Sequence, residues 1–456
     1  MKSTVKCGWA LLALVFLASM AGAQPLNENA ALYYWEALAL MRQPASAEEF
    51  PIIDFIRNDL PLLPPSILTA QTGAAQLLMG ERAMVAALAR AGRCTRCEFA
   101  VRTPSDPFPA LDHLNPMRAL ADRALAVAKA YEFGQNSEGA AAIYRDLLVL
   151  VRNLDKDGTM RSGFAAADML QQILLDLEGF LSREPDRSAV AILADFFLQA
   201  ERPLFHPGDY LRAESLSFRQ WILKDPRQIE QKLIKLYGGA AESGAVVQLM
   251  SLDTPRKVIR MGNWVMDYEA WMLRLAKECE EPYERGIGSL RWSDSEKLRM
   301  IKEQSGADGN PLFALAIPSM APAYERFLAA EGQFSMATIM TAALLYLHDF
   351  GRWPVSLDEI SVVARGPLPL DPFSGEDFFY KTSRLLPRVM MRAPKSMIDA
   401  GNIMFRMDVK ARRESDEDLF KQGLKAFEKR WKNEALRAAQ KNLAEEQAVS
   451  REIPKR

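Results

Sequence analysis

The chain has 456 residues, 49% of them hydrophobic and 25% charged, and a formal net charge of −1. This composition is ordinary for a folded protein, and the near-neutral charge gives no overall field that would attract nucleic acid or an anionic membrane surface. The sequence contains only three histidines, His113, His206 and His348, which disfavours histidine-rich metal sites and most histidine-based acid–base schemes. We therefore predict neither a metal, nor another cofactor, nor a nucleic-acid partner.

Residues 1–23 have the pattern of a secretory signal peptide. Two lysines precede an apolar run, which ends in a small-x-small cleavage pattern: Lys2, Lys6, Trp9–Ala18, Ala21 and Ala23. The apolar run is shorter than the roughly 20 residues that a membrane-spanning helix needs. We predict cleavage before Gln24, which gives an exported bacterial protein, periplasmic or secreted, without a membrane span. A retained membrane anchor is the alternative.

Export places the remaining cysteines in an oxidising compartment, where disulfides form readily. Cys94 and Cys97 make a C-x-x-C pair. A thioredoxin-like pair belongs to a βαβ unit, whereas this one follows a helical pattern that stops at Gly92. A zinc site would need a second, suitably spaced pair of ligands, which the sequence lacks. We predict a Cys94–Cys97 disulfide or two plain thiols; a redox role is the alternative.

Helical periodicity dominates residues 24–305, and sustained strand-like alternation is almost absent. Capping boxes, first-position prolines and glycine stops divide this region into predicted helices. They cover residues 27–41, 46–59, 66–91, 115–133, 137–154, 165–182, 187–200, 225–236, 254–280 and a segment that begins at 293. We expect an irregular, all-α array of antiparallel helix pairs.

One pair resembles a tetratricopeptide hairpin. In "AYEFGQNSEGAAAIYRDLLVL", Ala140 and Tyr144 fall near the small and aromatic positions where the two helices of that hairpin meet. No clean second copy follows at the 34-residue period. Simple helix pairing is therefore the favoured interpretation, and the array is tetratricopeptide-like only in part.

Residues 311–410 predict a small α+β module. A long helix ends at Gly351, which can take the positive φ that such an ending requires. Trp353 offers an apolar plate and Pro354 stiffens the exit, after which "SLDE" forms a capping box for a short helix. Asp371 suits a side-chain-to-backbone turn. The strand "DFFYK" follows, and "MFRMDVK" at 404–410 is a second candidate strand.

The order of motifs in residues 311–382 resembles the C-terminal part of type II secretion major pseudopilins. In that family a helix with an A-L-x-x-Y pattern is followed by G-R-Y-P, a short helix, L-P-x-D-P-W-G and an aromatic strand. The matching residues here are Ala343, Leu344, Tyr346, Gly351, Arg352, Trp353, Pro354, Leu368, Pro369, Asp371, Pro372, Phe373, Gly375, Phe379 and Tyr380. The resemblance implies a pilin-like fold and structural roles for Gly351, Trp353, Pro354, Asp371, Pro372, Gly375 and Tyr380.

The chain departs from the pseudopilin pattern in two respects. Pilins carry the stalk helix at the N-terminus, whereas this segment is internal, so the resemblance does not imply incorporation into a pilus. The region that holds calcium in the family reads "TSRLLPRVMMRAPKS" and lacks clustered acids, so calcium is not implied. The layout as a whole also resembles a class of exported all-helical bacterial proteins, which implies no activity.

Residues 411–456 predict a charged amphipathic helix. Its apolar stripe consists of residues spaced by four, three and four positions: Phe420, Leu424, Phe427 and Trp431. Such a stripe docks on the body of its own chain or meets a partner, and we favour docking.

Three groups of residues suggest chemistry. Asp349, Asp358, Glu359 and Asp371 are candidates for a carboxylate pair. In "HPGDY", His206 lies beside Asp209, but no third partner is identifiable and a turn is favoured. "LDKDGTMRSG" begins like a calcium loop and is rejected because the glutamate required at loop position 12 is missing.

Few catalytic side chains and many helix pairs favour a non-catalytic scaffold or protein-interaction protein with an unidentified protein partner. The alternative is an exported hydrolase that uses carboxylates near the "GRWP" and "DPFSG" motifs. A weaker alternative is a carrier of an apolar ligand between helices.

Overall fold

The structure is a computed structural model. It describes residues 26–41, 72–99, 111–224, 252–279, 312–364, 366–383 and 386–391. The predicted signal peptide, the strand at 404–410, the helix at 411–456 and the helices at 46–59, 225–236 and beyond 293 lie outside these residues.

The described residues are mostly helical and carry two small sheets. The helices are α2 (Ala30–Leu40), α5 (Thr72–Ala91), α6 (Leu114–Phe133), α7 (Ser137–Asp155), α8 (Met160–Leu181), α9 (Arg187–Gln199), α10 (Pro207–Lys224), α13 (Thr254–Glu278), α15 (Leu312–Phe350) and α16 (Leu357–Ala364). The strands are β1 (Leu26–Asn29), β2 (Cys94–Arg96), β3 (Phe379–Ser383) and β4 (Leu386–Met390). The predicted fold class, mostly α with a small sheet-containing module, is confirmed.

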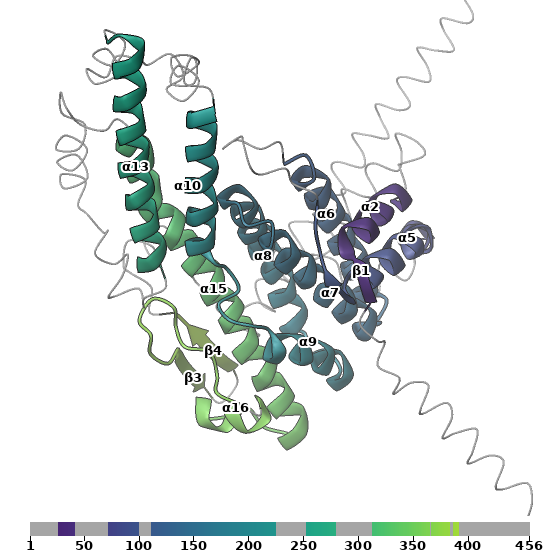
Figure 1. The fold of residues 1–456 in the computed structure, drawn as a ribbon. Helices are drawn as coiled ribbons and strands as arrows, with labels where there is room; N and C mark the ends of the chain where they lie inside the picture. The colour runs from purple at the N-terminus through teal and green to yellow at the C-terminus, as the bar shows by residue number, and fades with distance from the viewer. Residues whose placement is uncertain are drawn as a thin grey trace, which may run out of the picture.

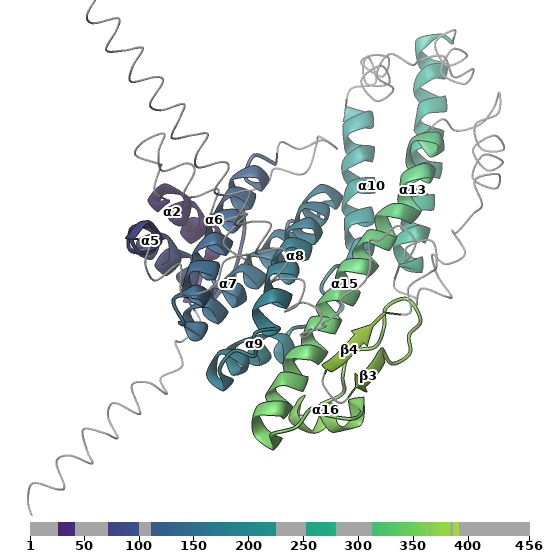
Figure 2. The ribbon, with the colours of Figure 1, turned by 180° about the vertical axis from the view of Figure 1, so that it is seen from behind.

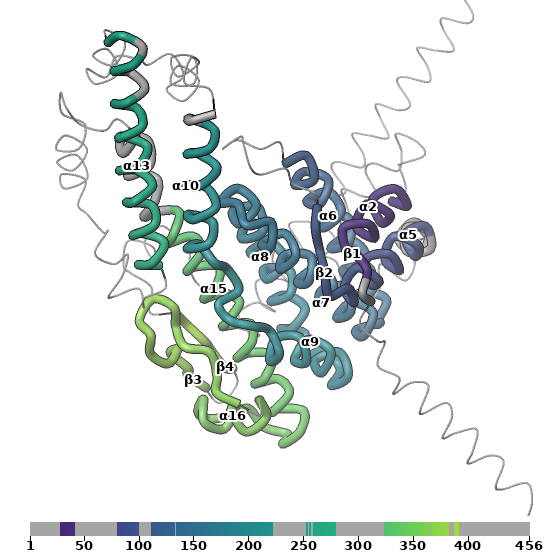
Figure 3. The backbone as a smooth tube through the Cα atoms, viewed as in Figure 1, coloured from purple at the N-terminus to yellow at the C-terminus, as the bar shows by residue number. Residues whose placement is uncertain are grey.

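Helix α15 is the axis of the arrangement. It contacts α8 and α9 along its length, α13 toward its N-terminal half, and α16 and β4 toward its C-terminal half (Figure 1). Helices α2 and α5 to α7 form the far end of the molecule, and α10 lies beside α13 in both views (Figure 2). The tube view shows that β1 and β2 run next to each other beneath α2 (Figure 3).

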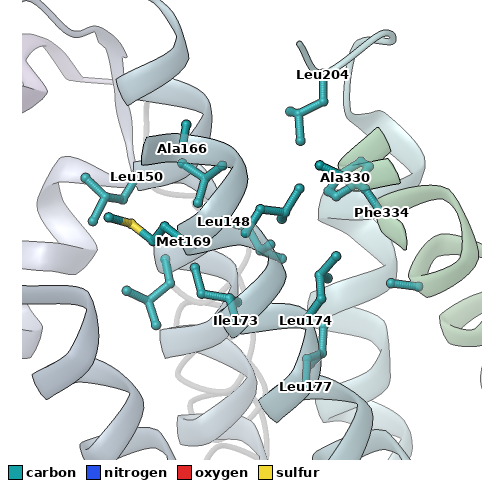
Figure 4. Packing of buried hydrophobic residues seen from close by; sticks show 14 of the residues in the cluster. Leu148, Leu150, Ala166, Met169, Ile173, Leu174, Leu177, Leu204, Ala330 and Phe334 are labelled. Carbon is teal, nitrogen blue, oxygen red and sulfur yellow. The ribbon is translucent and has the colours of Figure 1, made fainter. Parts of the chain in front are cut away.

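One continuous apolar core joins α7 and α8 to α15. Leu150 on α7 lies near Met169 on α8, while Leu174 and Leu177 lie along the side of α8 nearer to Phe334 on α15 (Figure 4). All of these side chains are buried. Removing apolar area from water is the main contribution to the stability of such an array.

The α6–α7 hairpin places Ala140 and Tyr144 in the interior, where both are fully buried. Tyr144 packs against Phe180 of α8 with ring centroids 5.6 Å apart and donates a hydrogen bond of 2.5 Å to Glu132. These two positions therefore lie where the helices meet, as the tetratricopeptide-like spacing predicted.

The parallel pair of β1 and β2 was not predicted, because we expected residues 24–305 to be all-α. Leu26 pairs with Cys94 and Asn29 with Arg96. The Asn29 side chain donates to the Glu98 carbonyl at 2.9 Å, and accepts from Glu98 N–H at 2.8 Å and from Ala31 N–H at 3.1 Å. Asn29 therefore caps α2 and joins the strands, and strands this short produce no alternating pattern.

Several helix starts differ from the predictions. Helix α8 begins at Met160 rather than 165, because the side chains of Thr159 and Ser162 form a capping box. Asp253, not Thr254, caps α13 and accepts from Arg256 N–H at 3.0 Å. Helix α10, Pro207–Lys224, was not predicted at all: the "HPGDY" segment was interpreted as a turn, whereas Pro207 begins this helix, where a missing N–H has no cost.

An ionic cluster between the buried Glu331 and the half-buried Arg202 fixes the α9–α10 connection to α15. The Arg202 guanidinium lies 3.2 Å from Glu331 and donates to Ser335 and Thr338 at 2.6 Å each. The other oxygen of Glu331 accepts from Leu204 N–H at 2.7 Å. Paired charges with satisfied hydrogen bonds tolerate burial, whereas a single remaining charge would not.

Among the described residues, only the segment Ala323–Phe350 of α15 is long and apolar enough to cross a membrane. Within the protein, 83% of its most apolar window is buried, and the helix packs as the central core element. Its apolar character is therefore explained by the core.

Several carboxyl groups are desolvated, and Glu214 on α10 is the simplest case. It accepts from Met160 N–H at 3.1 Å, and burial raises the pKa of Glu214 to about 7. A group with a raised folded-state pKa contributes stability below its unfolded pKa, and this contribution is lost as the pH rises through the folded value. The free energy of unfolding should therefore fall between pH 5 and pH 8.

The variant Glu214→Gln should remove about 1–3 kcal/mol of this pH-dependent change, because the amide oxygen still accepts from Met160 but does not ionise. Chemical denaturation at pH 5 and pH 8 measures the difference. Glu201→Gln, at an exposed position, is the control and should leave it unchanged. An unchanged pH dependence in Glu214→Gln would contradict the assignment.

Candidate functional site

The described residues from 350 to 391 form what we call the covering unit: α16, β3, β4 and their connections. Its buried side chains Ile360, Phe373, Phe378, Val389 and Met391 belong to the same core as α15. All seven residues predicted as the structural motif lie in this unit.

The exit from α15 follows the prediction. Gly351 has a φ of +68°, and its N–H bonds to the Leu347 carbonyl at 2.8 Å. A left-handed conformation at this point costs glycine nothing and would strain any other residue. Pro354 is buried and Trp353 packs against the core. These residues turn the chain back along the helix.

Glu359 closes the start of α16. Its carboxylate accepts two bonds from the Arg352 guanidinium, at 2.9 and 3.0 Å, and one from Val355 N–H at 2.9 Å. The hydrogen bonds from Arg352 are the main reason why the pKa of Glu359 is lowered to about 2. Ser356 accepts from Glu359 N–H at 3.5 Å, which is one half of the predicted capping box; in place of the other half, the Glu359 carboxylate binds Val355 N–H, one residue earlier than Ser356. Glu359 is thus a persistent anion that holds the turn.

Asp371 organises the second turn. It is fully buried, and its Oδ1 accepts from Phe373 N–H at 2.9 Å. Its backbone N–H bonds to the Glu376 carbonyl at 2.8 Å, and its carbonyl accepts from Gly375 N–H at 2.7 Å. Gly375 has a φ of +69°. The half-buried Pro372 lies inside this loop, so the "DPFSG" motif forms a closed turn around one carboxylate.

The two turns are joined through Tyr380. Its hydroxyl donates to the Pro354 carbonyl at 2.9 Å, and burial raises the pKa of Tyr380. Strand β3 pairs antiparallel with β4, placing Tyr380 opposite Val389. Strand β4 was not predicted, because Pro387 and Arg388 interrupt any strand-like pattern.

The four candidate catalytic carboxylates have separate surroundings. Asp349 pairs with the Arg187 Nε at 2.7 Å, Glu359 with Arg352, and Asp371 with its own turn. Asp358 is exposed at the start of α16. Three of the four thus make contacts that give them a structural role in the fold.

A second polar cluster joins two segments that the sequence did not connect. His206 Nδ1 lies 3.6 Å from the buried carboxylate of Asp155, which also accepts from the Tyr210 hydroxyl. The interaction of the His206 imidazole with the Asp155 carboxylate, which accepts from it, is the main cause that raises the pKa of His206. His206 therefore faces Asp155, at the end of α7, in addition to its sequence neighbour Asp209.

The nearby His113 bonds to Asp157 at 2.6 Å and stacks on Phe99, with ring centroids 4.5 Å apart. Across the part of the chain that the structure describes, no group of three or more His, Cys, Asp and Glu side chains is arranged to hold a metal ion. These histidines are anchors between the α7–α8 connection and its neighbours.

Cys94 and Cys97 are both buried and present as thiols in the structure. Cys94 donates weakly to the Arg90 carbonyl at 3.4 Å, and burial raises the pKa of Cys97 to about 12. Burial raises the pKa of Cys94 as well, so both thiols are poor nucleophiles at neutral pH.

The covering unit exposes several large apolar side chains. Among the described residues, thirteen large hydrophobic side chains are exposed, and five of them belong to this unit. These five, which we call the outer-face residues, are Phe350, Val355, Val362, Leu370 and Phe379. Their exposed fractions lie between 49% and 68%. Their exposure was not predictable from the sequence, because a motif does not reveal which side of a turn faces solvent.

No family model, curated protein or solved structure matches this chain. The resemblance of residues 311–382 to pseudopilins therefore stands on the sequence motifs alone.

Proposed function

We propose that the chain is an exported, non-catalytic helical scaffold that binds another protein through the covering unit. One observation carries the proposal: the conspicuous polar residues of this unit bond within the fold, while its outer-face residues expose apolar side chains. Apolar surface concentrated in one small unit marks a protein-interaction site more often than a chance exposure.

The contacts of the acids support binding over hydrolysis. A general acid needs a pKa near the working pH, whereas the Arg352 guanidinium keeps the pKa of Glu359 at about 2. Asp371 accepts from Phe373 N–H in a turn. Mutating either acid would therefore disturb the fold, and the hydrolase alternative has less support than the scaffold.

The rigidity of the unit also supports a binding role. Two positive-φ glycines, the Arg352–Glu359 pair and the Tyr380–Pro354 bond hold its turns in one shape. A preorganised surface loses little conformational entropy when it binds. The pseudopilin-like motifs cover this same unit, so the resemblance is compatible with an interaction role.

The test is a binding comparison between outer-face variants and a matched control. Val362→Glu and Phe379→Glu place a charge on the outer face, whereas Leu175→Glu changes an equally exposed leucine on α8. Each tagged, exported chain is recovered from the cell envelope, and co-purified proteins are quantified by mass spectrometry.

We expect at least one protein to co-purify with the wild type and with Leu175→Glu, and to be reduced about tenfold or more with both outer-face variants. This corresponds to about 1.4 kcal/mol. Melting curves should be unchanged, because the substituted side chains are exposed. Equal recovery from all four chains would contradict the proposal.

A further inference from the structure

Helix α13 has two opposite apolar faces, of which only one packs against other residues that the structure describes. Its buried face, which includes Trp264, Trp271 and Leu275, packs beside α10. At 3.6 residues per turn, the residues on the opposite side recur at alternating spacings of four and three. They form what we call the α13 stripe: Ile259, Asn263, Met266, Ala270 and Leu273.

All five residues of the stripe are exposed. Its three large members, Ile259, Met266 and Leu273, are 45% to 65% exposed and are spaced by seven residues. A strict seven-residue repeat of this kind is the pattern of a two-helix seam, with Asn263 and Ala270 as the intervening layer. The solvent-facing side of an ordinary helix is polar and does not carry such an apolar repeat.

A row of charges borders one edge of the stripe. It runs Asp253, Arg260, Asp267 and Arg274, so the charges alternate in sign at seven-residue spacing. We call this row the charge column. Three of these side chains also make contacts within the chain. Asp253 and Arg274 lie 3.8 and 3.6 Å from Arg256 and Glu278 and remain more than half exposed. The guanidinium of the half-buried Arg260 lies over the Trp264 ring, 5.6 Å from its centroid.

The charge column is self-complementary when two copies of α13 lie antiparallel. In that orientation equivalent edges of the two helices face each other. Aligning Arg260 with Asp267 of the partner subunit also aligns Asp253 with Arg274 of the partner subunit. Two-fold symmetry repeats both pairs, so four oppositely charged contacts form and no like charges meet.

The same alignment brings the stripes into contact. Ile259 then faces Ala270 of the partner subunit, and Asn263 faces Met266 of the partner subunit. Large side chains meet small or polar ones, so the two helices can approach closely. In a parallel pair, by contrast, the two charge columns would lie on opposite edges of the seam and would not meet.

We propose that α13 is a homodimerisation surface that binds α13 of a second copy in an antiparallel pair. The apolar stripe supplies the affinity, and the charge column sets the orientation, since exposed ion pairs individually contribute little. This surface is separate from the outer-face residues, so the proposal goes beyond the proposed function and does not depend on it.

The test is the mass of the purified exported chain in solution, measured by sedimentation and light scattering between about 1 and 100 μM. We expect the wild type to be a dimer in the upper part of this range. Met266→Lys should shift it to monomer. Leu216→Lys, which changes an exposed leucine on α10 outside the stripe, should leave the dimer intact.

Charge exchange tests the orientation. Asp267→Arg alone should give monomer, because the introduced guanidinium would meet Arg260 of the partner subunit, and symmetry repeats this repulsion. The double variant Arg260→Asp, Asp267→Arg should restore the dimer, because the pair is exchanged and not removed. Circular dichroism melts check that each variant folds.

A wild type that is monomeric at all concentrations would overturn the proposal. So would a dimer that withstands Met266→Lys in a folded protein. A dimer that dissociates with Met266→Lys but is not restored by the double charge exchange would overturn the antiparallel pairing.

Discussion

Glu331→Ala should destabilise the protein by about 3–5 kcal/mol, the expected cost of removing one partner of a buried ion pair. The substitution leaves the Arg202 guanidinium without its carboxylate and removes the acceptor of Leu204 N–H. Because these bonds fix the α9–α10 connection to α15, the loss should appear as a lower free energy of unfolding in urea.

Two controls separate this effect from simple truncation. Glu331→Gln keeps an acceptor for Leu204 N–H, so it should cost less than Glu331→Ala. Glu201→Ala changes an exposed residue near the same connection and should stay within about 0.5 kcal/mol of the wild type. A loss below about 1 kcal/mol for Glu331→Ala would show that the cluster does not fix the connection.

Phe327→Ala should cost about 3–5 kcal/mol, in the range of other buried phenylalanine truncations. Phe327 of α15 is buried between aromatic rings of three other segments: its ring centroid lies 5.1 Å from Phe164, 5.6 Å from Phe205 and 5.3 Å from Tyr210. A side chain added at Gly163 would approach the rings of Tyr210 and Phe327, so the junction has no spare room. The cavity should therefore persist.

The control is Phe379→Ala, which removes the same side chain from an exposed strand position. It should change the unfolding free energy by about 0.5 kcal/mol or less. Comparable losses for both variants would mean that the α8–α10–α15 junction is not the core that the structure describes.

Features encoded by a few neighbouring residues were predictable. Gly92 and Gly351 end their helices where expected, and Ser137 begins α7 as predicted. The bond from Glu359 N–H to Ser356 and the Asp371 turn also form, because their partners lie within four residues along the chain.

Features that depend on distant pairing were not predictable. Strand β1 depends on β2, some 68 residues later (Leu26 with Cys94). The contact that His206 makes depends on Asp155, which is the last residue of α7. Helix α10 as a whole was missed: "HPGDY" has both turn and helix-start signals, and packing against α13 favours the helix.

The candidate site likewise has one part that could be predicted from the sequence and one part that could not. The polar motif residues were found in advance because turns need particular residue types. The outer-face residues and the α13 stripe required the fold, since a hydrophobic residue in a sequence is interpreted as core until its surroundings are known.

The most direct test of the proposed binding role is site-specific photo-crosslinking in living cells. A photo-reactive phenylalanine analogue replaces Val362 in the covering unit or, as control, Leu175 on α8; both positions are exposed. If the covering unit binds another protein, position 362 should give a defined covalent adduct with that protein, and position 175 should give none. No adduct at position 362, or the same adducts from both positions, would contradict the proposed binding role.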